Sequence, residues 1–194
     1  MVADPETTEL NQAWVGYQRG KTALTLGRQR LVLDNARFIG DVGWRQNQQT
    51  FDAFKVQDKT LPDTTLTYAY LEQVNRVFSR RHPQGCWDSD SHLLHATRTA
   101  KGVGTFAVYG YLLSFANAAA NSCATYGASL TGKRPLASPL ELTYRLEYAT
   151  QTARDPSPLR YRADYLAGEA GLSQDTHAIS LGYEQLGSDH GVGV

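Results

Sequence analysis

The sequence lacks any long apolar run. None of its segments reaches the roughly 18 consecutive apolar residues that a membrane-spanning helix needs, so a transmembrane helix is excluded. Hydrophobic residues make up only 41% of the chain and methionine occurs once, whereas tyrosine occurs 11 times and glycine 17 times. This composition is typical of β-structure. It does not exclude a membrane β-barrel, whose alternating strands carry a weaker hydropathy signal.

An excess of charge of one sign is also missing. Lysine plus arginine and aspartate plus glutamate number 19 each, so the formal net charge at pH 7 is zero. Proteins that bind DNA or RNA usually show a basic excess, so no nucleic-acid partner is expected. Residues 1–10 (MVADPETTEL) have neither a basic segment nor an apolar segment, so the sequence as written has no secretory signal peptide. A barrel protein needs such a peptide, and a barrel interpretation therefore requires that the chain be a fragment.

Cysteine is scarce, with Cys86 and Cys123 as the two examples. Two cysteines are too few for a disulfide scaffold, and their spacing does not match a zinc site. Two interpretations remain. The cysteines are unrelated thiols, or they form a disulfide in an oxidising compartment, since both lie in or beside the longer predicted connections.

Motifs for catalysis and cofactor binding are absent as well. The stretch with Ser91, His92 and His95 contains no nucleophile elbow and no paired carboxylates, and no phosphate-binding loop occurs elsewhere. Asp88 and Asp90 have the chemistry of calcium ligands, but the spacing of an EF-hand is missing and a solvated loop is favoured. We therefore predict that the chain is not an enzyme and has no catalytic residues, no metal and no cofactor.

The strongest positive pattern lies in residues 140–148 (LELTYRLEY), where apolar and polar residues alternate without interruption. Because a β-strand directs successive side chains to opposite faces, one face of this segment is apolar and the other is largely charged. We predict that Leu140, Leu142, Tyr144, Leu146 and Tyr148 face outward, with Glu141, Arg145 and Glu147 toward the water-filled side. A membrane barrel and a soluble sandwich both provide such surroundings.

Nine more segments have the patterning of strands, and no helix is predicted. The ten predicted strands cover residues 9–17, 22–33, 51–57, 64–73, 92–99, 104–115, 123–131, 140–148, 159–171 and 176–186. Their connections alternate between short ones and mostly longer ones, as in outer-membrane barrels with short periplasmic turns and long outer loops. A Greek-key sandwich gives no reason for this alternation.

Aromatic residues near the predicted strand ends allow the same two interpretations. They are Trp14, Tyr17, Tyr70, Tyr148, Tyr161 and Tyr183. Amphipathic rings favour the headgroup region of a membrane, so these residues would form an aromatic girdle. In a sandwich they would instead fill the core between two sheets.

Residues 26–53 (LGRQRLVLDNARFIGDVGWRQNQQTFDA) resemble the alginate export family of outer-membrane barrels. Residues 87–94 (WDSDSHLL) and 124–130 (ATYGASL) also resemble it, in the same order, so the similarity spans nearly the whole chain. It implies an all-β fold, an up-and-down antiparallel transmembrane β-barrel of about eighteen strands that is monomeric. Residues 1–194 would then be a single β-barrel domain, incomplete at both ends, with about ten of those strands.

The resemblance also implies a function. The chain would belong to a channel or exporter of the cell outer membrane, surrounded by membrane lipid and passing an anionic polysaccharide such as alginate. A general porin for small solutes is one alternative. A soluble β-barrel module that binds a ligand in a polar interior is another.

An exporter of this family has a cationic lumen for its polyuronate. Arginine suits this role because its permanently charged fork binds a carboxylate through two hydrogen bonds. The candidate pore-lining and substrate-binding residues are Arg28, Arg30, Arg37, Arg45, Lys55, Glu141, Arg145, Glu147 and Arg162. Arg145 has an alternative role, since it shares a strand face with Glu141 and Glu147 and would pair with either.

The sequence leaves two structural questions open. Arg28 and Arg30 have the same parity as Leu26, so strict alternation puts them on its apolar face unless a bulge at Gly27 resets the facing. The connection 34–49 either folds inward as a constriction or covers the mouth of the barrel.

Overall fold

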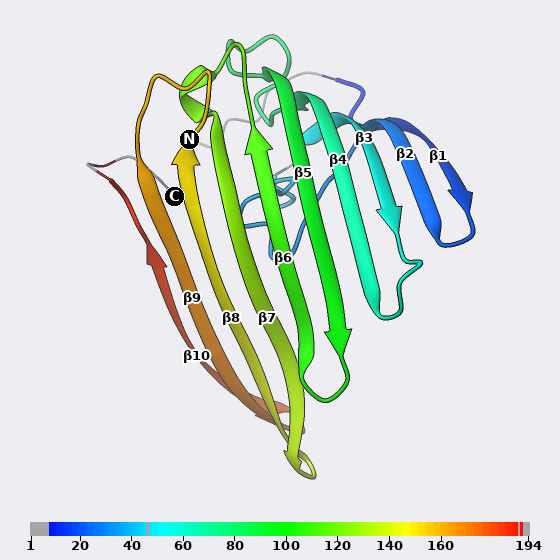
Figure 1. The fold of residues 1–194 in the computed structure, drawn as a ribbon, viewed down its shortest axis with the longest axis vertical. Coiled ribbons are helices and arrows are strands. Elements are labelled where there is room, and N and C mark those ends of the chain that lie inside the picture. Colours follow the sequence, from blue (N-terminus) through cyan, green and yellow to red (C-terminus); the bar gives the residue numbers. More distant parts are fainter. Residues whose placement is uncertain (1–7, 46, 190, 192–194) are drawn as a thin grey trace.

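A computed structural model, which describes residues 8–45, 47–189 and 191, contains one antiparallel sheet of ten strands in chain order (Figure 1). The strands are β1 (Ala13–Arg19), β2 (Thr22–Gln29), β3 (Thr50–Asp58), β4 (Thr64–Asn75), β5 (Cys86–Ala100), β6 (Gly104–Leu113), β7 (Cys123–Ala137), β8 (Leu140–Ala153), β9 (Arg162–Gln174) and β10 (His177–Leu186). A short 3₁₀ helix, η1 (Ala119–Asn121), precedes β7. Each strand pairs with its neighbours in the sequence, which is an up-and-down arrangement.

Each predicted strand has a counterpart, and the alternation of connections is confirmed. The short turns lie at one end of the sheet and the long connections 30–49, 76–85, 114–122 and 154–161 lie at the other (Figure 1). A single curved sheet also excludes the sandwich, which requires two sheets packed face to face. Within the described residues, no helix is long and apolar enough to cross a membrane.

Two predicted loops are strand instead. β5 begins at Cys86, so Asp88 and Asp90 lie on a strand rather than in a solvated loop. β7 continues through the predicted turn 132–138, and Pro135 is accommodated beside a shift in register. Both extensions are polar, so the alternation that marks a strand in the sequence is weak there. The backbone ladder with the neighbouring strand maintains the extended conformation.

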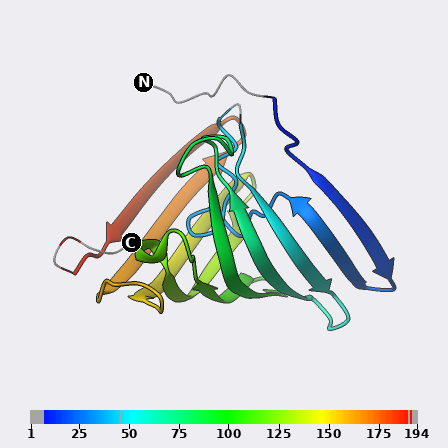
Figure 2. The ribbon, with the colours of Figure 1, turned by 90° about the horizontal axis from the view of Figure 1, so that it is seen from above.

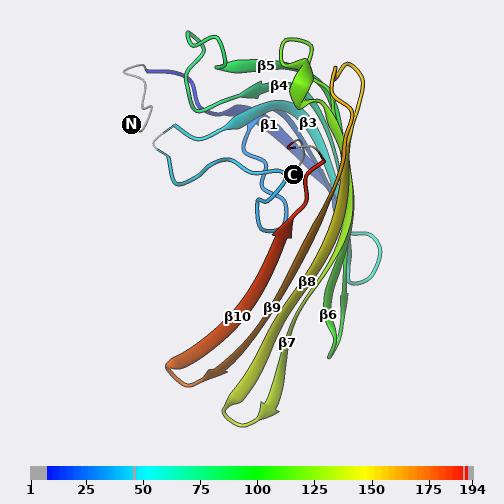
Figure 3. The ribbon, with the colours of Figure 1, turned by 90° about the vertical axis from the view of Figure 1, so that its left-hand side faces the viewer.

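The sheet is strongly curved and has a convex and a concave face (Figures 2 and 3). Cross-strand pairs such as Leu26–Phe54, Leu130–Leu146 and Tyr148–Leu166 place apolar residues of neighbouring strands on the convex face. We call the exposed apolar side chains of this face the outer belt: Leu26, Phe54, Leu66, Leu94, Phe106, Val108, Tyr126, Leu146, Tyr148, Leu166, Ile179, Leu181 and Tyr183. A belt of this extent marks a surface that meets lipid or another apolar partner.

The burial of β8 follows the predicted alternation. Leu146 and Tyr148 are 57% and 48% exposed, whereas Glu147 between them is 4% exposed. Glu147 faces the concave side, where its carboxylate accepts a hydrogen bond from Tyr109 of β6. The two faces of this strand therefore differ in polarity in the predicted direction.

The connection 30–49 folds inward over the concave face, which answers the question that the sequence leaves open (Figures 2 and 3). Leu31 and Ile39 of this connection are buried in one cluster with residues of β3, β4, β5, β6, β8 and β9. The ring of Phe38 lies 5.8 Å from Tyr109 and 5.6 Å from Tyr165, measured between ring centroids. These apolar residues are surrounded by polar ones in the sequence, and burying them requires contact with the sheet. We call residues 30–49 the inner loop.

We expect Phe38→Ala to loosen the inner loop, because its ring provides the packing against Tyr109 and Tyr165. The cost should be about 1–3 kcal/mol, below that of a fully buried phenylalanine, since Phe38 is half-buried. Limited trypsin digestion of the full-length protein should then cleave faster at Arg37. Phe78→Ala, the same change in the connection 76–85, is the control. Equal cleavage rates at Arg37 in the two variants would contradict this role for Phe38.

The outer belt predicts that arginine substitutions at two adjacent positions of β10 differ in their effect on stability. Leu181 belongs to the belt, and Ser180 has the opposite facing. If the belt lies in a bilayer, Leu181→Arg should destabilise the protein by about 2–4 kcal/mol near the midplane and less near the interface. Ser180→Arg should have little effect. Urea unfolding of the full-length protein in phospholipid vesicles measures both values, and a similar loss for the two variants would exclude a lipid-facing belt.

Candidate pore-lining surface

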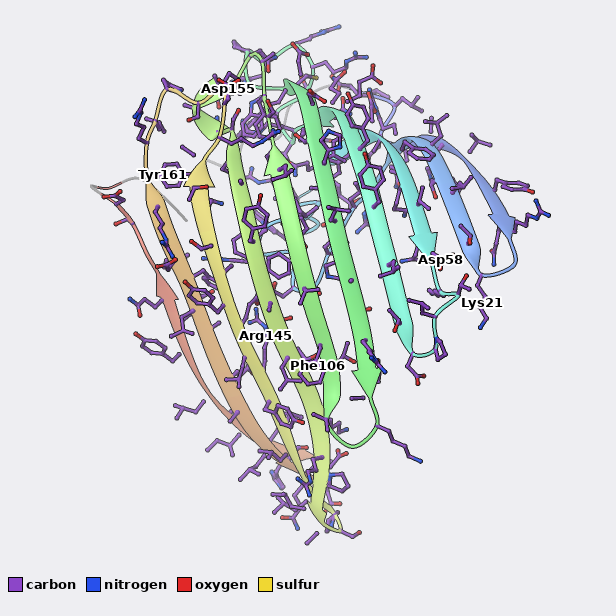
Figure 4. All side chains as sticks on the ribbon, in the orientation of Figure 1. Lys21, Asp58, Phe106, Arg145, Asp155 and Tyr161 are labelled. Carbon is purple, nitrogen blue, oxygen red and sulfur yellow. The ribbon has the colours of Figure 1, made fainter. Side chains whose placement is uncertain are left out.

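The concave face beneath the inner loop carries a network of charged and tyrosine side chains. Arg145 of β8 forms an ion pair with Glu147 on the same strand. The hydroxyl of Tyr109 donates to the other oxygen of the Glu147 carboxylate at 2.6 Å. A buried carboxylate needs partners that replace water, and these two groups provide them. Arg145 thus contributes to a neutralised pair on the inner face, about midway along the sheet (Figure 4).

Arg37 joins the inner loop to the last two strands. Its guanidinium carbon lies 5.0 Å from the centre of the Tyr165 ring, and a guanidinium nitrogen lies 3.9 Å from the carboxylate of Glu184. Tyr165 also donates a hydrogen bond to Glu184 at 2.8 Å. A cation over an aromatic face and near a carboxylate is held in two directions, so Arg37 is positioned against the barrel wall.

A third contact fixes the first half of the inner loop. The Nε2 atom of His95 lies 2.9 Å and 3.0 Å from the two carboxylate oxygens of Asp34. His95 is buried on the concave face of β5, and its ring stacks on Tyr109 at a centroid distance of 6.4 Å. Tyr109 therefore touches His95 and Phe38 and also bonds Glu147, and it links the loop contacts to the ion pair of β8.

The remaining candidates on the concave side differ in their partners. Arg30 forms an ion pair with Asp41, which closes the base of the inner loop. The guanidinium of Arg45 lies 4.4 Å from the Trp44 ring, and its Nη1 atom is buried without a hydrogen-bond partner. Lys55 is half-buried on the inner face of β3, and among the described residues no acidic side chain pairs with it.

Glu141 pairs with Lys133 of β7 at 2.6 Å and not with Arg145. Acidic side chains thus neutralise three of the predicted cations on the inner side, Arg30, Arg37 and Arg145, and also Lys133. The pairs are Arg30–Asp41, Arg37–Glu184, Lys133–Glu141 and Arg145–Glu147. In the described part of the chain the concave face is consequently not strongly cationic. Lys55 and Arg45 are the predicted cations on it without an acidic partner.

Arg28 is on the other face, contrary to its assignment as a pore-lining residue. The pairing of β2 with β1 and β3 shows no register shift at Gly27, so Arg28 retains the facing of Leu26. It binds Asp52 through two hydrogen bonds of 2.7 Å and 2.8 Å. Gly27 has a φ of +117°, and a Cβ atom there would lie 2.5 Å from the carbonyl oxygen of Ala13. The glycine serves this close approach of β1 and does not form a bulge.

Arg162 is also outside the concave surface. It lies 3.8 Å from Asp164 on β9, and Asp164 accepts a hydrogen bond from Tyr148 of the outer belt. Alternation along β9 gives Arg162, Asp164 and Leu166 the same convex facing. The parity of these three residues is visible in the sequence. The predicted strand 159–171 has the same parity, so the convex facing of Arg162 could have been read from the sequence.

Of the two interpretations of the cysteines, the structure agrees with unrelated thiols and contradicts the disulfide, because Cys86 and Cys123 are free. Cys86 begins β5 and Cys123 begins β7, and β6 lies between these strands. With neighbouring strands about 4.8 Å apart, the two strands are separated by about 9.6 Å, beyond the roughly 7 Å that a disulfide allows between Cα atoms. The thiol of Cys86 instead lies 3.8 Å from the side-chain oxygen of Asn75.

Sequence reasoning missed the residues that hold the inner loop. Tyr109, Tyr165, Glu184, Asp34 and His95 come from distant segments, and no spacing in the sequence connects them. The facing of residues 104–115 is ambiguous in the sequence, so the pattern does not reveal that Tyr109 points inward. Among the described residues, no group of three or more His, Cys, Asp or Glu side chains is arranged to hold a metal ion.

The family model described as alginate export matches residues 1–183. The BenF-like porin from Pseudomonas fluorescens Pf-5 has a TM-score of 0.76 at 13% identity, with 90% of this chain and 45% of that chain covered. OccK1 (OpdK) of Pseudomonas aeruginosa gives 0.75 at 17% identity, with 91% and 47% covered. OpdL of Pseudomonas aeruginosa gives 0.71 at 20% identity, with 89% and 47% covered. No curated protein sequence matches the chain.

At these identities the solved structures establish the fold, and the chain spans about half the length of each of them. The family match extends over nearly the whole chain and confirms the resemblance that residues 26–53 carry. The chain belongs to the alginate export family, and it is an outer-membrane protein with the strands of an up-and-down antiparallel β-barrel.

Proposed function

We propose that this chain forms part of a passive, monomeric outer-membrane channel for small polar solutes. The observation that carries this proposal is the inner loop, which packs on the concave face of the sheet. A loop packed on one side of a barrel narrows its lumen and confines the passage to the space that the loop leaves open. The outer belt provides the lipid-facing surface that such a channel needs.

The charges on the inner surface support a channel for polar solutes of mixed charge. Arg145 and Arg37 lie close to Glu147 and Glu184, and Glu169 lies opposite Arg145 in the register of β8 and β9. Since opposite charges alternate over a short distance, the passage has a strong local field without a large net charge. Such a surface attracts and orients polar molecules, and it does not reject either sign of ion outright.

A second candidate function is the passage of an anionic polysaccharide such as alginate. Two observations favour it: the family match and the cations Lys55 and Arg45, which have no acidic partner among the described residues. A carboxylate of a uronate polymer would be a suitable partner for both groups. In this case the polymer would pass the part of the inner face of β3 that carries Lys55.

We expect Arg145→Glu to shift the channel toward cations. The change removes the partner of Glu147 and places a further negative charge beside Glu147 and Glu169. Reversal potentials in a planar bilayer under a salt gradient measure this shift, which should weaken as the salt concentration rises. Arg162→Glu, the same change on the convex face, is the control. An unchanged reversal potential in an Arg145→Glu channel that still conducts would remove Arg145 from the passage.

The second candidate predicts a distinct effect at Lys55. Lys55→Gln should weaken current blockade by short oligouronates several-fold, because an unpaired cation next to the passage is lost. Blockade by a neutral oligosaccharide of equal length should remain the same. Single-channel recordings with both oligomers provide the comparison. Equal blockade by the two oligomers in the original protein would contradict a preference for anionic polysaccharides.

A further inference from the structure

A cavity of about 520 Å³ lies on the concave side, at the end of the sheet with the long connections. Its walls come from the inner loop, the ends of β3 to β8, η1 and the connection 154–161. Tyr161, which closes one side, lies at this end of the sheet, whereas Lys21 and Asp58 mark the opposite end (Figure 4). The volume is within the range of about 300–1,000 Å³ that is common for sites of small molecules.

Aromatic rings form a large part of the wall. Phe38, Trp87 and Tyr161 are half-buried, and Phe115 is buried behind Trp87 at a centroid distance of 4.9 Å. The guanidinium of Arg76 lies 4.2 Å from the Trp87 ring and helps to fix its orientation. Rings held in this way offer apolar surface to a ligand without losing much conformational freedom on binding.

Amide and hydroxyl groups supply the polar part of the wall. The side-chain nitrogen of Gln151 donates to Thr125 at 3.0 Å, and its oxygen accepts a bond from the hydroxyl of Tyr161 at 3.1 Å. The nitrogen of Gln49 donates to the carbonyl of Gly40 at 2.9 Å, which leaves its oxygen as an acceptor. Asn121 lies exposed at the rim. The amides of Gln49 and Gln151 are therefore oriented by the protein and retain capacity for a further hydrogen bond.

No charged side chain lines the cavity among the described residues. Burial and the neighbouring thiol of Cys123 raise the pKa of Tyr161 to about 12, so its phenol is neutral at physiological pH. A charged ligand would lose water in the cavity and gain no ionic partner. An uncharged ligand with hydroxyl groups on an apolar ring satisfies both parts of the wall, because its ring face can lie on the aromatic groups and its hydroxyls can bond the amides.

We propose that this cavity binds the uncharged ring of a saccharide, and we call it the saccharide pocket. The proposal rests on the proposed channel function, since the pocket lies beside the inner loop on the side where a solute would approach or leave it. A neutral sugar would be held by Trp87, Tyr161 and Gln151 before it passes the inner loop. This assignment differs in chemistry from the ion pairs beneath the loop, which suit charged groups.

The test compares D-glucose with D-glucuronate, which has a carboxylate in place of the terminal hydroxymethyl group. Saturation-transfer NMR of the full-length protein in detergent detects weak binding of either probe. We expect glucose to bind at least several-fold more tightly than glucuronate. Benzyl alcohol serves as an aromatic probe without a sugar ring. Tighter binding of glucuronate, or binding of benzyl alcohol without binding of glucose, would overturn the proposal.

Two variants assign the binding to the pocket. Gln151→Leu removes the amide that Tyr161 and Thr125 orient, and Asn121→Leu changes an exposed residue at the rim. Both should reduce the glucose signal at least threefold. Gln57→Leu, a glutamine on the inner face of β3 outside the pocket, should leave the signal unchanged. Equal signals in the original protein and both pocket variants would place the sugar elsewhere and overturn the proposal.

Conductance of the same proteins in a planar bilayer separates this proposal from the channel function. Gln151→Leu should conduct like the original protein, since it changes no charge in the passage. A protein that conducts and does not bind glucose would refute the saccharide pocket alone. A protein that binds glucose in the pocket and never conducts would refute the channel function and leave the binding site in place.

Discussion

The side chains of each strand alternate between two faces, and the hydrogen bonds between neighbouring strands keep each set of side chains on the same face of one sheet. This constraint determines the remaining features. Because the side-chain period of a strand is two, a slip of one residue would move the outer belt to the concave face. The antiparallel pairing from β1 to β10 keeps the outer belt on the convex face, although the register shifts in the pairs β3–β4, β4–β5 and β7–β8.

The inner loop can pack on the concave face because that face offers apolar ring surface as well as polar groups. Tyr109 and Tyr165 present aromatic rings there and still bond Glu147 and Glu184 through their hydroxyls. Their apolar ring faces receive Phe38, and their hydroxyls stabilise carboxylates that pair with arginines. Tyrosine thus allows one face to hold an apolar loop and an ionic network together, which neither phenylalanine nor serine would achieve.

Charged side chains are unevenly distributed along the concave side, which therefore has a charged region beneath the inner loop and an uncharged one at the saccharide pocket. Beneath the loop, ion pairs compensate each other and leave a strong local field with little net charge. At the end with the long connections, the saccharide pocket has aromatic and amide groups and no lining charge among the described residues. The two regions share Phe38, whose ring contacts the tyrosines and also lines the pocket. A change in the loop would therefore affect both regions.

The strands and the facing of β8 follow from the amino-acid sequence alone, because alternation in a segment such as 140–148 is a local property of the chain. The family follows from it too, since residues 26–53 form a distinctive stretch. The same local pattern underestimates β5 and β7, where polar residues continue a strand whose backbone is paired with its neighbours. The folded sheet was needed to establish the inward position of the loop, the pairing of Arg37 with Glu184 and the absence of a bulge at Gly27 that would have turned Arg28 inward. These features depend on curvature, on register and on contacts between distant segments, and no local pattern in the sequence contains them.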